Sequence, residues 1–310
     1  MQAQRFAPRT IADRYPYPVE GPIAWQRNSD GYRAEVPLLE LAVDEIVVPS
    51  FAMLDAARYG FRFALEAGAE RWLLAPIAMT ERTDAAPGGA VTTHIDYFHV
   101  RNALAGAVLV VEVAAELLPD TRYLLTVARR PYRMTPDAGS RVACTLPVPP
   151  VSQLTAPPAI RHKICSTTCV NMVLRYFGVP THNGELTALT HHAPSQMFGV
   201  WPLNMWAASR KGALGAIELF TSLDDAVPAL AAGLPVVSSI RFRAGELVGA
   251  PLDATGGHLV VLTGLTADSA VANDPAGRGI DGVLRRYRRE QFAAAWLTER
   301  GAAYVMLPPS

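Results

Sequence analysis

The sequence has few cysteines and no net charge. Its three cysteines, Cys144, Cys165 and Cys169, form an odd and sparse set, which indicates a reducing compartment rather than a secreted fold built on disulfides. The 28 basic residues balance the 28 acidic ones, so the chain lacks the positive excess that nucleic acids and anionic membrane surfaces attract. We therefore expect neither nucleic acid nor a membrane as a partner.

Long apolar runs are also missing. The most apolar run, Ala105–Leu118, is broken by Glu112 and Glu116, and it is shorter than the ~20 residues that a membrane-spanning helix needs. The first twenty residues contain no apolar stretch of the kind found in signal peptides. Together with the sparse cysteines, these absences predict a cytoplasmic protein.

The chain does have the length and the apolar content of a folded protein. It spans 310 residues, and 50% of them are hydrophobic, a composition that excludes a disordered chain. Domains commonly contain about 100–200 residues. We therefore predict two domains, each with a core of its own.

The first half of the chain is rich in short β-type segments. Several of them alternate with a period of two residues, as Phe61 and Phe63 do on either side of Arg62. This is the period of a half-buried strand. Many short strands at near-regular spacing indicate an antiparallel sandwich. We predict an N-terminal extension over residues 1–30 and an all-β sandwich domain over residues 31–144.

A proline-rich stretch follows the β-type segments. Residues 145–158 hold five prolines, and because proline fixes φ and removes a hydrogen-bond donor, we predict an extended linker there. Beyond the linker, helical patterns come first, with a kink expected at Pro228, and short apolar strands come afterwards. Helices segregated from antiparallel strands are typical of an α+β layer. Residues 159–310 are therefore predicted to form an α+β domain.

The most distinctive chemical feature is Cys165, the first residue of the segment CSTTCVNMVLRYFG. The spacing of Cys169, Met172 and Tyr176 predicts a helix from Cys165 to Gly178. A thiol at a helix N-terminus meets unpaired backbone N–H groups and the positive end of the helix dipole, which lower its pKa below the usual ~8.5. Cys165 is therefore a candidate nucleophile.

We expect three further residues to complete a site for acyl transfer. His258 opens an apolar strand and is the candidate base, and Asp274 ends the next strand sixteen residues later. A tight turn at Ala267–Ser269 makes these strands antiparallel neighbours, which brings the imidazole and the carboxylate to the same end of one hairpin. Gln153 lies upstream of the cysteine, and its side-chain amide can donate a hydrogen bond to a developing oxyanion.

Other interpretations of the same residues stay open. A buried cysteine is most often a small apolar side chain, and Cys169, one helical turn beyond Cys165, fits core packing better than a redox pair. A zinc site built from Cys165, Cys169 and His162 lacks a second pair of ligands at the required spacing. We expect no metal and no organic cofactor.

The cysteine segment resembles the nucleophile helix of the C39-like papain-fold peptidases, whose common form is Cys-Gly/Ser-Pro-x-x-x-x-Met-Val-Leu-x-Tyr-x-Gly. The segments GHLVVLTG, NDPA and SQ are similar to the family's base, acid and oxyanion motifs, and they contain His258, Asp274 and Gln153. One departure is Thr167, which stands where the family has proline. The matching positions of the helix are Cys165, Ser166, Met172, Val173, Leu174, Tyr176 and Gly178.

This resemblance implies a papain-like cysteine peptidase domain over residues 159–310. Cys165 would be its nucleophile, His258 its base, Asp274 the residue that orients the histidine, and Gln153 an oxyanion donor. The segments WPLN and YRREQFAAAWL also resemble a bacterial subgroup in which a β-sandwich precedes the peptidase domain. The implied reaction is hydrolysis of a peptide or small amide substrate through a thioester.

Two other functions are compatible with the same residues. An amine or a thiol can take the acyl group of the thioester in place of water, which would make the protein an acyltransferase, and an amidase would use the same thioester. Alternatively, a degenerate peptidase fold can act by binding alone. Product analysis with an added nucleophile separates hydrolysis from acyl transfer. The reactivity of Cys165 toward a thiol probe tests whether the protein is an enzyme or acts by binding alone.

Overall fold

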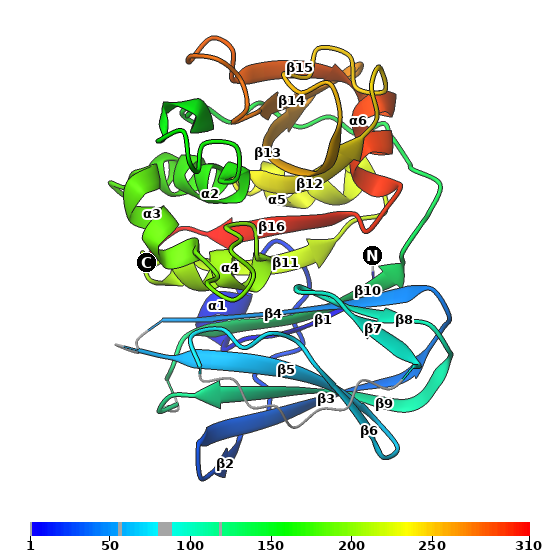
Figure 1. The fold of residues 1–310 in the computed structure, drawn as a ribbon. Coiled ribbons are helices and arrows are strands. Elements are labelled where there is room, and N and C mark those ends of the chain that lie inside the picture. The colour runs from blue at the N-terminus through cyan, green and yellow to red at the C-terminus, as the bar shows by residue number, and fades with distance from the viewer. Residues whose placement is uncertain (1, 55–57, 80–88, 118–119) are drawn as a thin grey trace.

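The computed structural model describes the whole chain except residues 1, 55–57, 80–88 and 118–119. In the described residues, the N-terminal half forms two five-stranded sheets and the C-terminal half forms one six-stranded sheet with helices on both faces (Figure 1). The elements of the N-terminal half are β1 (Gln2–Phe6), α1 (Arg9–Ala12), β2 (Gln26–Asn28), β3 (Gly31–Leu41), β4 (Glu45–Met53), β5 (Gly60–Ala67), β6 (Glu70–Leu73), β7 (Val91–Thr93), β8 (Phe98–Val100), β9 (Leu104–Ala114) and β10 (Tyr123–Pro131).

The two N-terminal sheets are antiparallel and share one apolar core. Their strand orders are β1-β10-β4-β8-β7 and β2-β3-β9-β5-β6. Strand β3 alternates between buried and exposed residues along much of its length, whereas every residue of β4 is buried. Alternation marks a strand with one wet face, so β4 must be covered on both faces. One face contacts the second sheet, and the other contacts the C-terminal half.

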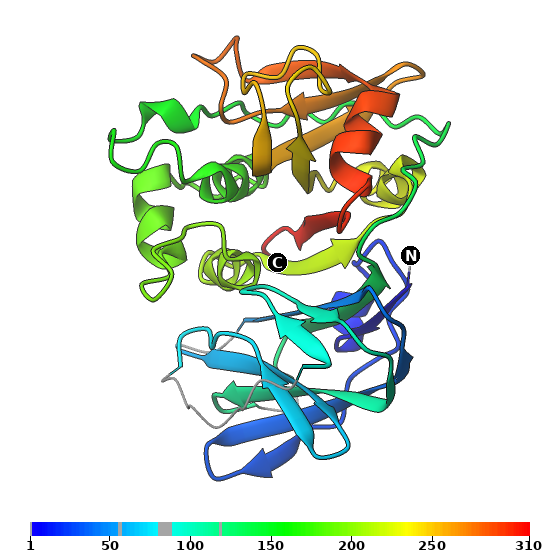
Figure 2. The ribbon, with the colours of Figure 1, turned by 45° about the vertical axis from the view of Figure 1, so that its right-hand side comes forward.

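The C-terminal sheet has the antiparallel order β11-β16-β12-β13-β14-β15. Helices α2, α3 and α4 lie on one side of it, and α5 and α6 lie on the other (Figure 2). The elements of this half are η1 (Gln153–Thr155), α2 (Cys165–Tyr176), α3 (Asn183–Thr190), α4 (Trp201–Ser209), β11 (Leu214–Leu219), η2 (Leu223–Ala226), α5 (Val227–Ala231), β12 (Val236–Phe242), β13 (Thr255–Leu265), β14 (Ser269–Asn273), β15 (Leu284–Arg288), α6 (Arg289–Leu297) and β16 (Ala302–Leu307).

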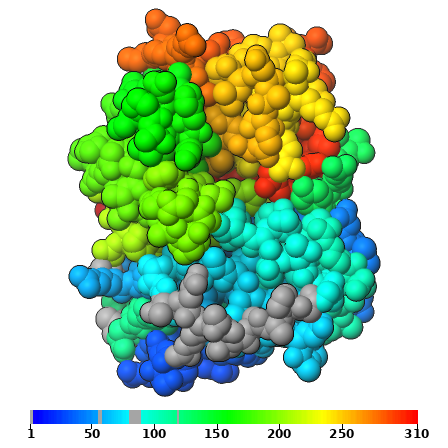
Figure 3. Space-filling view, in the orientation of Figure 1, coloured from blue at the N-terminus to red at the C-terminus, as the bar shows by residue number. Residues whose placement is uncertain are grey.

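The two halves meet along a broad front (Figure 3), and their cores are continuous. Ala52 and Leu124 of the first sheet belong to the same buried cluster as Phe220 and Trp296 of the C-terminal half. This finding corrects the expectation of two separate cores. Because β4 is apolar on both faces, its outer face is buried only while the C-terminal half covers it.

Polar contacts also cross this interface. The Ile217 N–H donates to the Ser50 hydroxyl over 2.8 Å. The Arg5 guanidinium forms a buried ion pair with Glu218, with 2.7 Å between Nε and Oε1, and the Tyr15 hydroxyl donates to the same Oε1 over 2.9 Å. The segment assigned to an N-terminal extension thus provides part of the interface, and its residues 2–6 pair with β10 as β1.

The proline-rich stretch is extended, but it lies against the C-terminal sheet. The Leu146 N–H donates to the Thr263 carbonyl over 2.8 Å, and the Asn273 side-chain amide donates to the Val148 carbonyl over 2.9 Å. Gly264 allows this close approach, because a Cβ there would lie 2.7 Å from the Cα of Thr145. The stretch is therefore held first against β13 and then against β14, and Gln153 is bound to the loop after β14.

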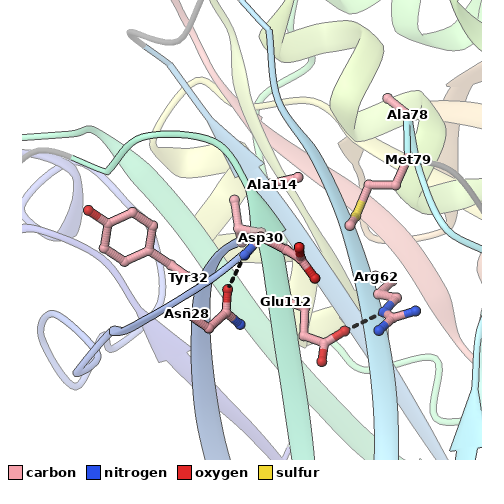
Figure 4. A pocket seen from close by; sticks show the side chains of 9 residues that line it. Asn28, Asp30, Tyr32, Arg62, Ala78, Met79, Glu112 and Ala114 are labelled. Carbon is pink, nitrogen blue, oxygen red and sulfur yellow. Dashed lines mark hydrogen bonds and ion pairs between the residues drawn. The ribbon is translucent and has the colours of Figure 1, made fainter.

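A cavity of about 500 Å³ lies in the N-terminal half (Figure 4). Two of its charged lining residues pair with each other, since the Glu112 carboxylate contacts Arg62, and the other oxygen of Glu112 lies 3.1 Å from the guanidinium of Arg71 outside the lining. None of the candidate residues Cys165, His258 and Asp274 lines this cavity. Among the described residues, no helix combines the length and apolar character that a bilayer crossing requires.

Candidate active site

Cys165 is the first residue of α2, as the sequence predicts. The N-cap residue, Ile164, offers no side-chain hydrogen bond to the helix. The N–H groups of the first turn therefore have no side-chain cap, and they face outward with the positive end of the helix dipole. The Ile164 carbonyl accepts the N–H of Thr168 over 2.8 Å, which starts the regular helix directly after the cysteine.

Buried side chains hold α2 in place from its first turn. The Ser166 and Tyr304 hydroxyls lie 2.9 Å apart, which ties the helix to β16. The Thr167 and Thr190 hydroxyls lie 2.8 Å apart, which ties it to α3. Thr167 occupies the position of the proline in the C39-like pattern, so here a hydrogen bond between helices fixes the start of α2.

His258 and Asp274 meet at one end of the β13–β14 hairpin. The Thr266 N–H donates to the Ser269 carbonyl over 2.8 Å and closes the tight turn. At the other end, 2.7 Å separates Nε2 of His258 from Oδ1 of Asp274, and the two residues are only 3% and 1% exposed. The hairpin expected from the spacing of these residues is present.

Asp274 accepts hydrogen bonds from two further donors. The Ala276 N–H donates to Oδ1 and the Tyr287 hydroxyl donates to Oδ2, each over 2.9 Å. Tyr287 lies on β15 and is buried. Its role is not visible in the sequence, because a single aromatic residue in the run LRRYRRE carries no signal that relates it to Asp274.

The side chain of His258 lies close enough to the sulfur of Cys165 to act on the pKa of the thiol. Burial by itself raises the pKa of the Cys165 thiol. The nearby side chain and positive charge of His258 outweigh burial and lower that pKa, and the backbone N–H groups of Leu259 and Ser166 add to the effect. The structure thus favours a thiolate at Cys165.

The pKa of His258 moves in the opposite direction. Burial by itself lowers it, but the Asp274 carboxylate and the Cys165 sulfur raise it to about 10. Burial also raises the pKa of Asp274, whereas the charge and hydrogen bond of His258, followed by the other two donors, lower it below its ordinary value. At neutral pH these shifts describe an imidazolium beside a carboxylate, and the lowered pKa of Cys165 moves its thiol toward the thiolate.

Gln153 lies beside the loop that follows Asp274. Its backbone N–H donates to the Pro275 carbonyl over 2.8 Å, and the neighbouring Ser152 hydroxyl donates to the Gly277 carbonyl over 2.6 Å. The Gln153 side chain is only 4% exposed, and its Oε1 has no hydrogen-bond partner among the described residues. No hydrogen bond joins Gln153 to Cys165 within the described part of the chain.

Cys169 contributes to the core and not to the site. It is fully buried, and its S–H donates to the Leu259 carbonyl over 3.2 Å. Burial raises the pKa of this thiol well above its ordinary value, and the nearby Cys165 adds to the shift. All three cysteines are free. Cys165, Cys169 and His162 do not form a metal site, since no group of three metal-ligating side chains occurs in the described residues.

Comparison with known proteins matches residues 145–304 to the Peptidase_C39 like family. Two solved structures are similar to the chain. A C39-like peptidase from Bacillus anthracis has 19% identity and a TM-score of 0.42, covering 55% of this chain and 99% of its own. A double glycine motif protease from an AMS/PCAT transporter, in complex with the leader peptide, has 16% identity and a TM-score of 0.36, covering 57% and 99%. No curated protein matches the chain significantly.

Proposed function

The chain belongs to the Peptidase_C39 like family, and we propose that it is a cysteine peptidase that hydrolyses peptide or amide bonds with Cys165, His258 and Asp274. One observation carries the proposal: His258 is hydrogen-bonded to the Asp274 carboxylate over 2.7 Å and lies near enough to Cys165 for its charge to lower the pKa of that thiol. A thiolate beside an imidazolium is an activated nucleophile with an acid at hand.

In the first half of the proposed reaction, the Cys165 thiolate attacks the carbonyl carbon of the substrate. The carbonyl oxygen becomes an oxyanion. As the C–N bond breaks, the His258 imidazolium gives its proton to the leaving nitrogen, and the amine departs. The acyl group is left on Cys165 as a thioester, and His258 is left neutral.

In the second half, neutral His258 takes a proton from a water molecule, and the oxygen of that water attacks the thioester carbonyl. The C–S bond breaks, the carboxylic acid leaves, and the thiolate–imidazolium pair forms again. Each step uses protein groups and water only. An amine that replaces water in this half would give the acyl-transfer product.

We assign Asp274 the task of holding His258 in one orientation and stabilising its protonated form. The hydroxyl of Tyr287 and the N–H of Ala276 support this assignment, because they fix the carboxylate itself. Tyr287 is thus a positioning residue, which acts on the histidine through the aspartate.

For the oxyanion we propose two donors, the backbone N–H of Cys165 and the side-chain amide of Gln153. The uncapped first turn of α2 supports the first donor. The position of Gln153 supports the second, since its backbone is bound to Pro275, the residue directly after Asp274. Preorganised donors of this kind stabilise charge that develops in the transition state.

We also propose how the chain is organised around this site. The two N-terminal sheets would act as a β-sandwich domain over residues 31–144 with β1 added to it. Residues 159–310 would form the papain-like peptidase domain, and residues 145–158 would join the two while carrying Gln153. The close packing of β4 and β10 against β11 and α4 supports a fixed arrangement of these domains.

Digestion of a peptide library by the wild type and by Cys165→Ala tests the proposal. We expect cleavage by the wild type only. The wild type should also react with iodoacetamide far faster at Cys165 than at Cys144, which is exposed and free. A folded wild type that cleaves no peptide, and whose Cys165 is no more reactive than Cys144, would favour the non-catalytic binding protein instead.

A further inference from the structure

A pair of arginines lies at the end of the C-terminal sheet where β13 begins. Strand β12 pairs antiparallel with β16 and with β13, so the end of β12, the turn before β16 and the start of β13 lie at the same end of the sheet. Arg241 on β12 donates to the Gly256 carbonyl over 2.7 Å. Gly256 precedes His258 by two residues. Arg300 occupies the turn before β16, within electrostatic range of Arg241.

Two hollows lie at this end of the molecule, and Arg241 lines the larger of them. The larger, about 760 Å³, includes Arg133, Arg241, Thr255 and Gly256 in its lining. The smaller, about 290 Å³, is lined by residues of the N-terminal half and the segment that follows it, among them Tyr97, Tyr132 and Arg133. Arg133 lines both hollows. The surface next to the start of β13 is therefore built by both halves of the molecule.

The arginines of this surface differ in their partners. The Glu299 carboxylate contacts Arg241, lies 2.6 Å from Arg133 and accepts the Tyr132 hydroxyl over 3.1 Å. Arg300 forms no ion pair among the described residues, and its Nε is buried without a hydrogen-bond partner. Two guanidinium groups thus share one glutamate, and the guanidinium of Arg300 is left without a carboxylate.

Aromatic rings hold Arg300 in a fixed position. Its guanidinium carbon lies 5.3 Å from the centre of the Trp201 ring, and Tyr97 from the N-terminal half stacks on the same tryptophan at 6.1 Å. The Arg300 backbone N–H donates to the Tyr132 carbonyl over 2.8 Å. A guanidinium fixed in this way offers its N–H groups to a planar anion at a reduced entropic cost.

Asp96 is a carboxylate in electrostatic reach of Arg300, but it does not neutralise it. Its Oδ1 accepts the Trp201 N–H over 2.7 Å at the start of α4. Burial raises the pKa of Asp96 to about 7, against smaller opposing effects of that hydrogen bond and of Arg300. The Asp96 carboxyl group is therefore protonated, and uncharged, in a large fraction of molecules at neutral pH.

From this geometry we propose a substrate subsite, which rests on the proposed peptidase function: Arg300, flanked by Tyr97 and Arg241, binds a carboxylate of the peptide substrate. The carboxylate is either an acidic side chain or the free C-terminus. A singly charged planar anion matches one unpaired guanidinium, which can bind it through two parallel N–H groups. The N-terminal half thereby takes part in substrate selection, through Tyr97.

Binding to the Cys165→Ala variant tests the subsite without requiring turnover. The probes are fluorescent peptide pools in two kinds of matched pair. In the first kind, Glu is fixed at one position of the peptide in one pool and Gln at the same position in the other, and each position is tested in turn. In the second kind, one pool has a free C-terminus and the other has an amidated C-terminus. We expect the charged member of one pair to bind about ten- to a hundredfold more tightly than its neutral partner, as for a hydrogen bond to a charged group. The pair that shows the preference identifies the source of the carboxylate.

The preference should fall to near one in Cys165→Ala with Arg300→Gln, and it should be reduced only in part with Arg300→Lys, which keeps the charge. Cys165→Ala with Arg175→Gln is the matched control, because Arg175 is an exposed arginine on α2, and its preference should not change. Thermal unfolding of each variant shows that it is folded.

Equal binding of charged and neutral pools, no binding of any pool, or a preference that survives Arg300→Gln would overturn the subsite. Cleavage of the same pools by the wild type separates this result from the peptidase proposal. Cleavage that depends on Cys165 but ignores carboxylates contradicts the subsite alone, whereas carboxylate-selective binding without any cleavage contradicts the peptidase alone.

Discussion

The N-terminal and C-terminal halves are both built on antiparallel sheets, but they use buried charge differently. At the interface between the halves, a buried charge has permanent partners: Glu218 is bound by Arg5 and Tyr15. In the C-terminal half, the His258–Asp274 pair lies near a thiol, Cys165, whose pKa the charge of His258 lowers. The Glu218–Arg5 ion pair stabilises the fold. The His258–Asp274 pair lies beside a thiol and can therefore transfer a proton.

The comparison predicts first that the C-terminal half depends on the N-terminal half. Removal of residues 1–144 exposes the outer surface of β11 and α4, which is covered by β4 and β10 in the full chain. An exposed apolar surface of this kind promotes aggregation. We expect the truncated chain to be insoluble or to lack cooperative unfolding, as measured by solubility and circular dichroism. A soluble, cooperatively folding fragment would show that the composition was right to suggest independent cores.

The second prediction concerns the nucleophile. Cys165→Ser should reduce turnover below detection, by about 10⁴-fold or more, because a hydroxyl is far less ionised at neutral pH than a thiol at a helix N-terminus. The unfolding temperature should change little, since the two side chains are nearly the same size. Peptide hydrolysis and a thermal melt are the two measurements. Residual turnover close to that of the wild type would remove Cys165 from the mechanism.

A third prediction tests the Glu218–Arg5 ion pair at the interface. Glu218→Gln leaves the buried Arg5 guanidinium without its counter-charge, and breaking a buried pair in this way costs about 3–5 kcal/mol of unfolding free energy. We expect a lower denaturation midpoint in urea and an unchanged rate of Cys165 alkylation in the still-folded protein. An alkylation rate that fell with stability would show that the two kinds of buried pair are coupled.

The fourth prediction separates charge from orientation at Asp274. Asp274→Asn can still accept the hydrogen bond of His258, so we expect kcat/KM to fall by about ten- to a hundredfold while activity remains measurable. Asp274→Ala removes the orienting group and should cost roughly tenfold more. Equal loss in both variants, with the fold intact, would show that the negative charge itself is essential. No loss in either would exclude Asp274 from the site.

The smallest expected effect belongs to Tyr287→Phe. This substitution removes one of the donors to Asp274 and keeps the ring that stacks on Phe292. Loss of a single hydrogen bond of about 1 kcal/mol predicts a few-fold lower kcat/KM. Because the carboxylate becomes less stable, the acid limb of the pH profile should also move to higher pH. An unchanged profile would limit Tyr287 to a packing role.

Local signals in the sequence were sufficient to predict much of the candidate site's geometry. The apolar spacing after Cys165 and the close sequence interval between His258 and Asp274 predict the helix start and the hairpin, and both depend on neighbours in the chain. Tyr287 and Arg300 depend on strand order in the sheet instead. Strand order is a tertiary property, so the pattern around these two residues gives no sign of it.

Two errors of detail have physical causes. Strand β11 was not predicted, because all of its residues are buried and a short apolar run without alternation cannot be told from a helix segment. Pro228 was expected to kink a helix. In the structure, η2 ends at Ala226 and Pro228 lies in the first turn of α5, where its missing N–H would have had no partner in any case.

The central claim is that Cys165 and His258 form an ion pair, and the pH dependence of Cys165 alkylation by iodoacetamide tests it most directly. The lowered pKa of Cys165 predicts alkylation that persists below the ordinary pKa of a cysteine and declines as acid protonates the thiolate. The raised pKa of His258 means that the imidazolium persists across neutral pH. In His258→Ala the curve should move to higher pH and the neutral-pH rate should drop. A wild-type curve centred on the ordinary cysteine pKa, and identical in His258→Ala, would contradict the account.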